Sequence, residues 1–220
     1  MNTLLVILIT VIVAYPLYFC VIASLSNPTE VAAGNTLFWI KDFTLDAYKL
    51  VMKEKQLWIG YRNTIFYTIG AVLYRLALTI TAAYVMSKEK LPFRGILSVF
   101  FFIPMYIGGG MIPEFLLIKQ LGLLNNPLVM VVGAGVSAYN LIVCRQYFST
   151  SIHPTLYEAA YMDGASEWRT FTSIALPLAK PIIAVMTLYI GVGAWNNYYK
   201  ALLYIYDKAY YPLQLVLRNI

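Results

Sequence analysis

The chain has 220 residues, of which 60% carry apolar side chains and 12% are charged, and its mean hydropathy is +0.69. Soluble domains carry about 25% charged residues, so this composition indicates an integral membrane protein. The length suits one domain of several helices, and we expect the spans to leave no room for a separate soluble domain. The net charge of +6 comes from scattered bases rather than a basic stripe, which argues against nucleic-acid binding.

Five hydrophobic segments are candidates for membrane-spanning helices, since about 20 apolar residues cross the hydrocarbon core. We expect an uncleaved first helix, because its apolar run is longer than that of a signal peptide and no base precedes it. A polar loop over residues 26–62 follows, with a short helix opened by Thr44. The five expected spans cover about residues 4–25, 63–86, 95–118, 127–148 and 181–204.

The third of these segments is interrupted by Pro104, by the glycines at 108–110 and by Pro113. Such a broken helix either lines a transport path or packs closely against a neighbour. The loops at 87–94 and 145–180, on one side of the membrane, carry nearly as many bases per residue as those on the other. The positive-inside rule therefore does not orient the chain.

One polar segment, PTLYEAAYMDGASEWRTFTSIALPLAKP, stands between the fourth and fifth spans. Pro154 suits the first position of a helix and Gly164 the position just past its end. Ser166 is placed to cap a second helix, and Pro177 to stop it. The segment therefore predicts two short helices joined by a glycine turn and lying against the membrane face.

The first of these helices has features of a contact surface for another protein. Ala159, Ala160 and Gly164 have almost no side chain, so a second surface can approach the backbone closely. Glu158 and Asp163 can pair with a cation on that surface. On these residues alone, a plain interfacial helix that anchors the chain is an equally good interpretation.

The spacing of Glu158-Ala159-Ala160, Gly164, Ile174 and Leu176-Pro177 resembles the EAA loop of ATP-binding-cassette (ABC) importer permeases at every anchor position. Elsewhere, the resemblance is to carbohydrate-uptake permeases of the MalG-like type, most closely the LplC/YtcP-like subgroup. It covers nearly the whole chain and includes the stretches NTIFYTIG, GGGMIPEFLLIKQLGLLNN, WNNYYKALLYIYD and YPLQLVLRNI.

This resemblance implies an all-α integral membrane protein with the helical bundle of a type I importer permease (MetI-like), forming one permease domain over residues 1–220. Members of the family usually continue past YPLQLVLRNI and add a sixth span, so we expect a partial chain with five. It implies a multi-pass protein of the bacterial inner membrane, surrounded by lipid, with the loop 149–180 in the cytoplasm.

The resemblance also implies partners: a second permease subunit, an ABC ATPase dimer and an extracytoplasmic sugar-binding protein. The ATPase would bind ATP and Mg²⁺, and no cofactor is expected in this chain, which has no phosphate-binding loop motif. The EAA loop would bind the ATPase and transmit its movement to the spans. Its matched residues are Glu158, Ala159, Ala160, Asp163, Gly164, Ile174, Leu176 and Pro177.

Two places are candidates for the substrate path. Arg75 lies in the middle of the second span, where a charge is costly. Its side chain either pairs with a carbonyl group or with the partner permease, or it faces a transport path for an acidic sugar. Trp195, Asn196 and Asn197 combine an aromatic surface with amides that suit sugar hydroxyls, although an interfacial aromatic belt has the same composition.

No catalytic constellation is visible, because Glu114 is the only acid inside a span and His153 the only histidine. No metal site is expected either. The sequence therefore favours a carbohydrate permease without enzymatic activity of its own. A permease for amino acids or peptides is the nearer alternative, and an intramembrane enzyme the remote one.

Overall fold

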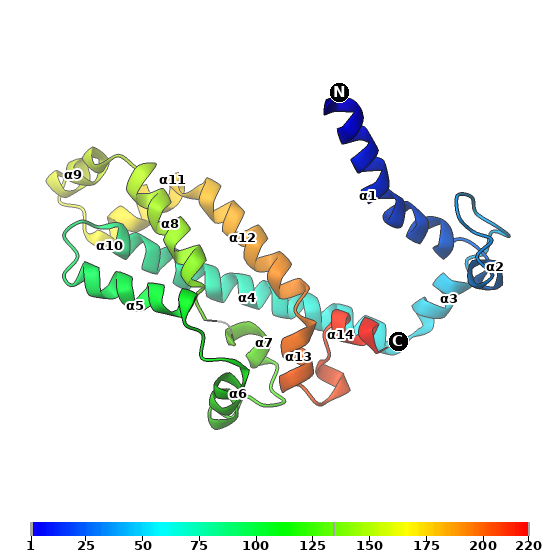
Figure 1. Ribbon diagram of the computed structural model, residues 1–220. Helices are drawn as coiled ribbons and strands as arrows, with labels where there is room; N and C mark the ends of the chain where they lie inside the picture. The colour runs from blue at the N-terminus through cyan, green and yellow to red at the C-terminus, as the bar shows by residue number, and fades with distance from the viewer. Residues whose placement is uncertain (1, 134, 220) are drawn as a thin grey trace. The chain divides into compact units, whose positions relative to one another are not determined.

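The computed structural model describes residues 2–133 and 135–219, and within these ranges helices are the only regular elements (Figure 1). The chain divides into two compact units, residues 1–58 and 59–220. That residues 1–220 form one permease domain remains a prediction.

The helices of the described residues are, in chain order, α1 (Asn2–Ser24), α2 (Pro28–Ala32), α3 (Asp46–Lys53), α4 (Lys55–Ser87), α5 (Arg94–Tyr106), α6 (Met111–Gln120), α7 (Leu128–Val132), α8 (Ala138–Thr150), α9 (Pro154–Met162), α10 (Glu167–Thr170), the π-helical turn η1 (Phe171–Ala175), α11 (Leu176–Leu178), α12 (Lys180–Trp195), α13 (Tyr198–Tyr204), the 3-10 turn η2 (Lys208–Tyr210) and α14 (Leu213–Arg218).

The first unit consists of α1 and the first part of the polar loop that follows it. The first expected span is confirmed as a helix, Asn2–Ser24, whose apolar side chains are largely exposed. A hydrogen bond of 2.8 Å between the hydroxyls of Ser24 and Tyr48 connects the C-terminal end of α1 to this polar loop. Thr44 caps α3 less directly than expected: the helix begins at Asp46, whose N–H donates to the Thr44 hydroxyl over 3.2 Å.

The second expected span is confirmed within α4, which begins eight residues earlier than expected, at Lys55. Its N-terminal part holds the C-terminal segment of the chain in place. Asn63 Nδ2 donates to the carbonyls of Ala209 and Tyr211 over 2.8 and 3.1 Å, and the Leu213 N–H donates to Thr64 Oγ1 over 2.8 Å. The stretches NTIFYTIG and YPLQLVLRNI therefore meet in space.

The expected break in the third span is confirmed. Helix α5 ends at Tyr106, α6 begins at Met111, and the two are bent by 114°. Gly110 between them has a φ of +84°, which side chains with a β-carbon rarely adopt. Pro104 lies within α5 and does not end it.

The structure corrects the last two expected spans. Residues 127–148 form no continuous helix, because the chain leaves the helix at Gly133, where a β-carbon would collide with the Val129 carbonyl oxygen. Helix α8 has 13 residues, or about 20 Å, which is shorter than the hydrocarbon core. The expected span 181–204 ends earlier, at Trp195, and α13 is a separate helix.

Two described helices, Thr3–Ser24 and Lys55–Ser87, are each long and apolar enough to cross a membrane. Two bent pairs have the composition of one further span each: α5 with α6, and Glu167–Leu178 with α12. Up to four spans are therefore identified among the described residues by length and composition, where five were expected.

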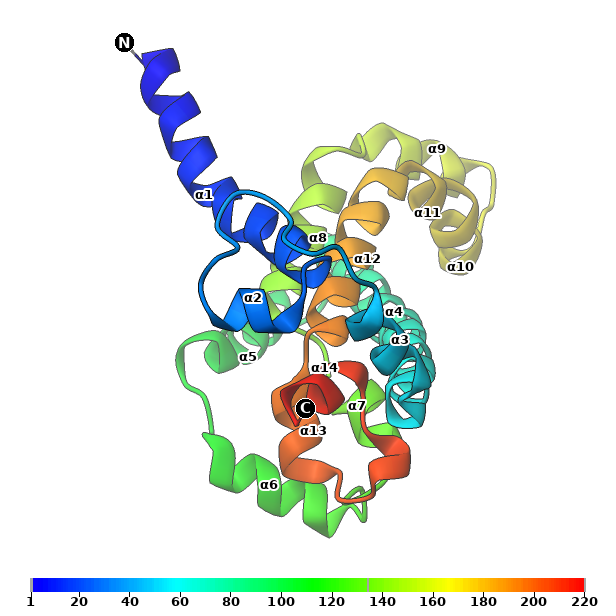
Figure 2. The ribbon, with the colours of Figure 1, turned by 90° about the vertical axis from the view of Figure 1, so that its right-hand side faces the viewer.

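The second unit has two separate hydrophobic clusters. One joins the C-terminal half of α4 to α8, η1 and α12, with Phe148, Phe171 and Met186 among its buried members. The other joins α6, α7, α13 and α14 around Tyr204. The polar segment with α9 to α11 lies at the end of the first cluster, away from α13 and α14 (Figures 1 and 2).

Candidate functional site

The polar segment folds into the predicted helix, glycine turn and helix, and residues within the segment set the helix ends. Helix α9 starts at Pro154, with His153 as its N-cap. The helix ends at Met162, and Gly164 follows with a φ of +71°. The Ala165 N–H then donates to the Ala160 carbonyl over 2.9 Å, which closes the C-terminal end of α9.

The second helix of the segment is irregular. Ser166 caps it as predicted, since its Oγ accepts from the Arg169 N–H over 3.3 Å. A π-helical turn over Phe171–Ala175 follows, closed by the Leu176 N–H donating to the Phe171 carbonyl. Pro177 does not stop the helix as expected. The chain stays helical to Leu178 and bends by 77° before α12, because Pro177 lies in the first turn of α11, where its missing N–H is tolerated.

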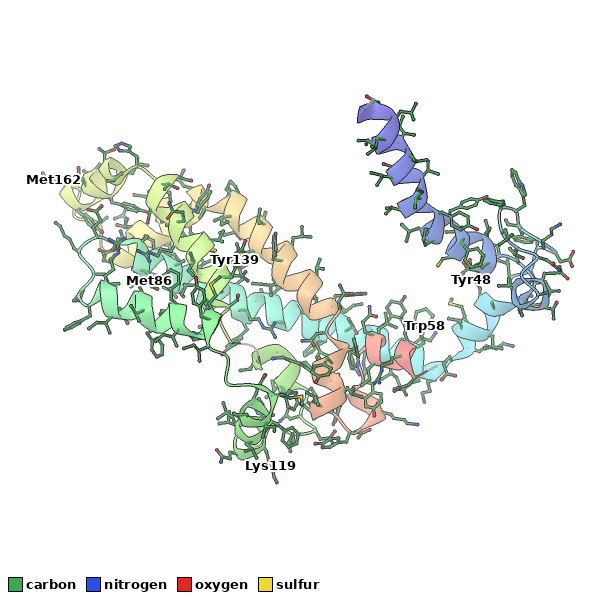
Figure 3. The ribbon with its side chains drawn as sticks, viewed as in Figure 1. Tyr48, Trp58, Met86, Lys119, Tyr139 and Met162 are labelled. Carbon is green, nitrogen blue, oxygen red and sulfur yellow. The ribbon has the colours of Figure 1, made fainter. Side chains whose placement is uncertain are left out.

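The outer face of α9 presents most of the residues expected to contact an ATPase. Glu158, Ala159, Asp163 and Gly164 are exposed. Met162, which is 89% exposed, lies at the C-terminal end of the same helix (Figure 3).

The other matched positions of the EAA pattern face inward to different degrees. Ala160 is only 5% exposed, so its small side chain serves packing within the chain rather than a contact surface. Ile174 and Leu176 are half-buried, with Leu176 packed against the cluster around Phe171, while Pro177 is exposed. The pattern therefore combines surface positions on α9 with packing positions further on.

A cluster around Lys88, which no sequence pattern predicted, connects the segment to α4. Lys88 Nζ lies 3.7 Å from Glu167 Oε2 and donates to the Tyr161 hydroxyl over 3.1 Å. That hydroxyl donates to Glu167 Oε1 over 2.6 Å, and the Tyr84 hydroxyl donates to Oε2 over 3.2 Å. The ammonium also lies 3.7 Å from the ring centroid of Tyr157. We name Lys88, Glu167, Tyr84, Tyr157 and Tyr161 the lysine cluster.

The surroundings of the lysine cluster determine its protonation. Burial lowers the pKa of Lys88, and the nearby Glu167 carboxylate opposes that shift. Burial raises the pKa of Tyr161 to about 12, with the hydrogen bond to Glu167 acting in the same direction. The Tyr161 hydroxyl therefore stays protonated near neutral pH and acts as donor to the carboxylate. The only signal in the sequence was that Lys88 lies in a loop expected on the same side as the segment.

Arg75 lies beside a cavity in the second unit. Its Nε and Nη2 donate to the carbonyls of Val131 and Met130 over 3.2 and 3.1 Å, which is the carbonyl pairing that the sequence left open. The cavity has a volume of about 150 Å³. Its lining residues are Arg75, Thr79, Gly135, Ser137, Asn140, Tyr189, Ile190 and Gly193.

The other candidates for the substrate path lie elsewhere. Trp195, Asn196 and Asn197 do not line the Arg75 cavity, and Asn197 Oδ1 is used to cap α13 by accepting from the Lys200 N–H over 3.2 Å. Glu114 forms an ion pair of 3.0 Å with Lys200.

Comparison with known proteins identifies the family. Residues 75–209, which include the whole of α9 to α12, match the family described as the binding-protein-dependent transport system inner membrane component. The chain belongs to this family. It is thus a permease component of the inner membrane with the MetI-like fold of type I ABC importers, as the EAA pattern predicted.

Similar proteins place the permease more finely within the family. It is 37% identical to Protein LplC of Bacillus subtilis over 205 residues, covering 93% of this chain and 69% of LplC. It is 32% identical to the B. subtilis polygalacturonan/rhamnogalacturonan transport system permease YtcP, covering 93% and 71% of the two chains. A chain of a bacterial ABC transporter involved in import of the acidic polysaccharide alginate superposes with a TM-score of 0.96 at 33% identity, covering 99% of this permease and 78% of that chain.

Proposed function

We propose that this permease is a membrane subunit of an ATP-driven importer and passes carbohydrate, as oligosaccharides or sugar derivatives, across the inner membrane. The observation that carries the proposal is its likeness over most of its length to YtcP and to the alginate importer, both named for polysaccharide transport. The alternative of amino-acid or peptide import has no such support in these relatives.

The importer is proposed to need further subunits. The family description names a binding protein on which transport depends, which supports an extracytoplasmic sugar-binding protein as partner. A second permease subunit and an ABC ATPase dimer complete the proposed assembly. ATP and Mg²⁺ would bind to the ATPase, since this chain has no phosphate-binding loop motif.

Helix α9 is the proposed docking element for the ATPase. Its exposed Glu158 and Asp163 offer negative charge beside the small Ala159 and Gly164, so a cationic surface can approach the backbone and pair with the carboxylates. The lysine cluster and the cluster around Phe171 connect this element to α4, α8 and α12. We propose that movement of α9, driven by the ATPase, reaches the spans through these contacts.

Reconstitution tests the proposed function. The permease with its ATPase, second permease and binding protein is placed in proteoliposomes, and ATP hydrolysis is measured with oligosaccharides, single amino acids or short peptides. We expect stimulation by oligosaccharides only. Stimulation by amino acids or peptides, with none by any oligosaccharide, would overturn the proposal.

A further inference from the structure

We propose that the cavity beside Arg75 is a subsite that binds the carboxylate of an acidic sugar residue during transport. This inference rests on the proposed carbohydrate transport and narrows its substrate class to oligosaccharides that contain uronic acids. The observations that carry it are the volume of the cavity, its charge and its hydrogen-bonding groups.

Three parts of the second unit form the cavity. Arg75 and Thr79 come from successive turns of α4, Ser137 and Asn140 from the start of α8, and Tyr189 from α12. Its volume of about 150 Å³ is several times the roughly 30 Å³ that one water occupies in the liquid. The space therefore admits a carboxylate together with part of the ring that carries it.

The charge of the cavity is positive and is not balanced by a carboxylate within the described chain. Arg75 is the one charged residue among those that line it, and both described hydrogen-bond acceptors of its guanidinium are neutral carbonyls. Glu114, the acid within a bent helix pair, is paired with Lys200. A cation at this depth is costly unless an anion or a polar path accompanies it. An anionic substrate would supply that charge.

The hydrogen bonds of Arg75 leave donors for a carboxylate. A guanidinium carries five N–H donors in one plane. The carbonyls of Met130 and Val131 accept from Nη2 and Nε, and neither of these hydrogen bonds uses Nη1. The two carbonyls therefore hold the planar group in place while its far edge remains able to grip both oxygens of a carboxylate.

The remaining lining groups suit a sugar ring. The hydroxyl of Ser137 and the amide of Asn140 can bond ring hydroxyls, and Tyr189 offers an aromatic face. A site of this composition also accommodates a neutral sugar, but a neutral sugar leaves the Arg75 charge unpaired. Discrimination between acidic and neutral rings therefore tests the inference.

The experiment compares an oligouronate with its matched neutral form, in which the carboxylates are reduced to primary alcohols. Uptake and ATP hydrolysis are measured in proteoliposomes that contain the complete importer, with the same binding protein throughout so that its selectivity cancels between variants. We expect the wild type to prefer the oligouronate, and Arg75→Gln to lose about tenfold or more of that preference, as for the loss of a charge-assisted hydrogen bond. Arg62→Gln, which removes an exposed positive charge from the same helix, should keep the preference.

Equal transport of the two substrates by the wild type would overturn the inference while leaving carbohydrate transport intact. An unchanged preference in Arg75→Gln would also overturn it. Failure of every oligosaccharide to stimulate the importer would contradict the proposed function instead.

A second measurement applies if Arg75→Gln does not assemble. Asn140→Cys, in a background with Cys20→Ser, is labelled with a small maleimide in the complete importer. We expect the oligouronate to slow labelling several-fold and its neutral form to have little effect. Equal labelling rates with the two probes would contradict a carboxylate subsite.

Discussion

Lys88, just past the C-terminal end of α4, and Glu167, at the start of α10, form an ion pair with 3.7 Å between Nζ and Oε2. The pair connects a membrane-spanning helix directly to the polar segment that carries the EAA pattern. Its lysine is 20% exposed and lies among three tyrosine rings, while the glutamate side chain is 66% exposed. We therefore expect the cation–aromatic contacts to contribute more than the ion pair, which solvent screens.

Replacing Lys88 by Met tests this connection, since Met keeps the length of the side chain and removes its charge. We expect the free energy of unfolding to fall by about 1–2 kcal/mol through lost cation–aromatic contacts. Substrate-stimulated ATP hydrolysis should fall several-fold at normal expression. The matched control is Lys90→Met, an exposed lysine in the same turn. Full stimulation in Lys88→Met would show that the lysine cluster plays no part in coupling.

Charge reversal at Glu158 tests docking of α9. Glu158 is exposed, so Glu158→Lys should leave the fold intact and repel a cationic ATPase surface. We expect the ATPase to be lost on purification, or retained without stimulation by substrate. Glu89→Lys, an exposed charge reversal in the turn after α4, should behave as the wild type. Normal coupling in Glu158→Lys would favour a simple membrane anchor.

Gly164 allows a test of the turn after α9. Its φ of +71° is unfavourable for a β-branched residue by roughly 1–2 kcal/mol, although no neighbouring atom of the chain lies within 4 Å of an added β-carbon. Gly164→Val should therefore lower both ATPase binding and coupling, while Gly164→Asn, which tolerates this conformation, should lower them less. Equal activity of the Val variant and the wild type in the ATP hydrolysis assay would count against a required turn.

Labelling of single cysteines tests the side of the membrane on which the polar segment lies. Met162→Cys and Lys90→Cys are exposed positions, and the resemblance to importer permeases places both in the cytoplasm. Neither should react with an impermeant maleimide in intact cells, whereas Lys53→Cys, beyond the other end of α4, should react. The parent protein has Cys20 and Cys144 replaced by Ser. Reaction at Met162→Cys in intact cells would reject the arrangement.

Gly60 tests the packing of the C-terminal helix on α4. A β-carbon at Gly60 would lie 3.1 Å from Leu213 Cα, so a larger residue has to displace the backbone of α14. Gly60→Leu should cost about 1–3 kcal/mol of stability, read as a lower melting temperature in detergent. Gly95→Ala, where an added β-carbon meets no atom within 4 Å, should retain or raise it.

The amino-acid sequence was sufficient for the family, the two long helices and the helix–turn–helix of the polar segment. Pro154, Gly164 and Ser166 act on the backbone within a few residues of themselves, so their effect is local and can be predicted. The composition of α1 and α4 likewise depends only on contiguous residues. The EAA spacing is a property of the chain and needs no fold to be recognised.

Tertiary structure was needed for the breaks within apolar runs and for every contact between distant segments. Residues 127–148 are mostly apolar, and hydropathy measures the length of such a run without detecting that the chain leaves the helix at Gly133. In a membrane, lipid and protein neighbours are both apolar, so apolar side chains do not reveal which face packs inward. The pairing of Lys88 with Glu167 and the cavity at Arg75 arise only when α4 packs against helices far away in the sequence, which is why no local pattern predicted them.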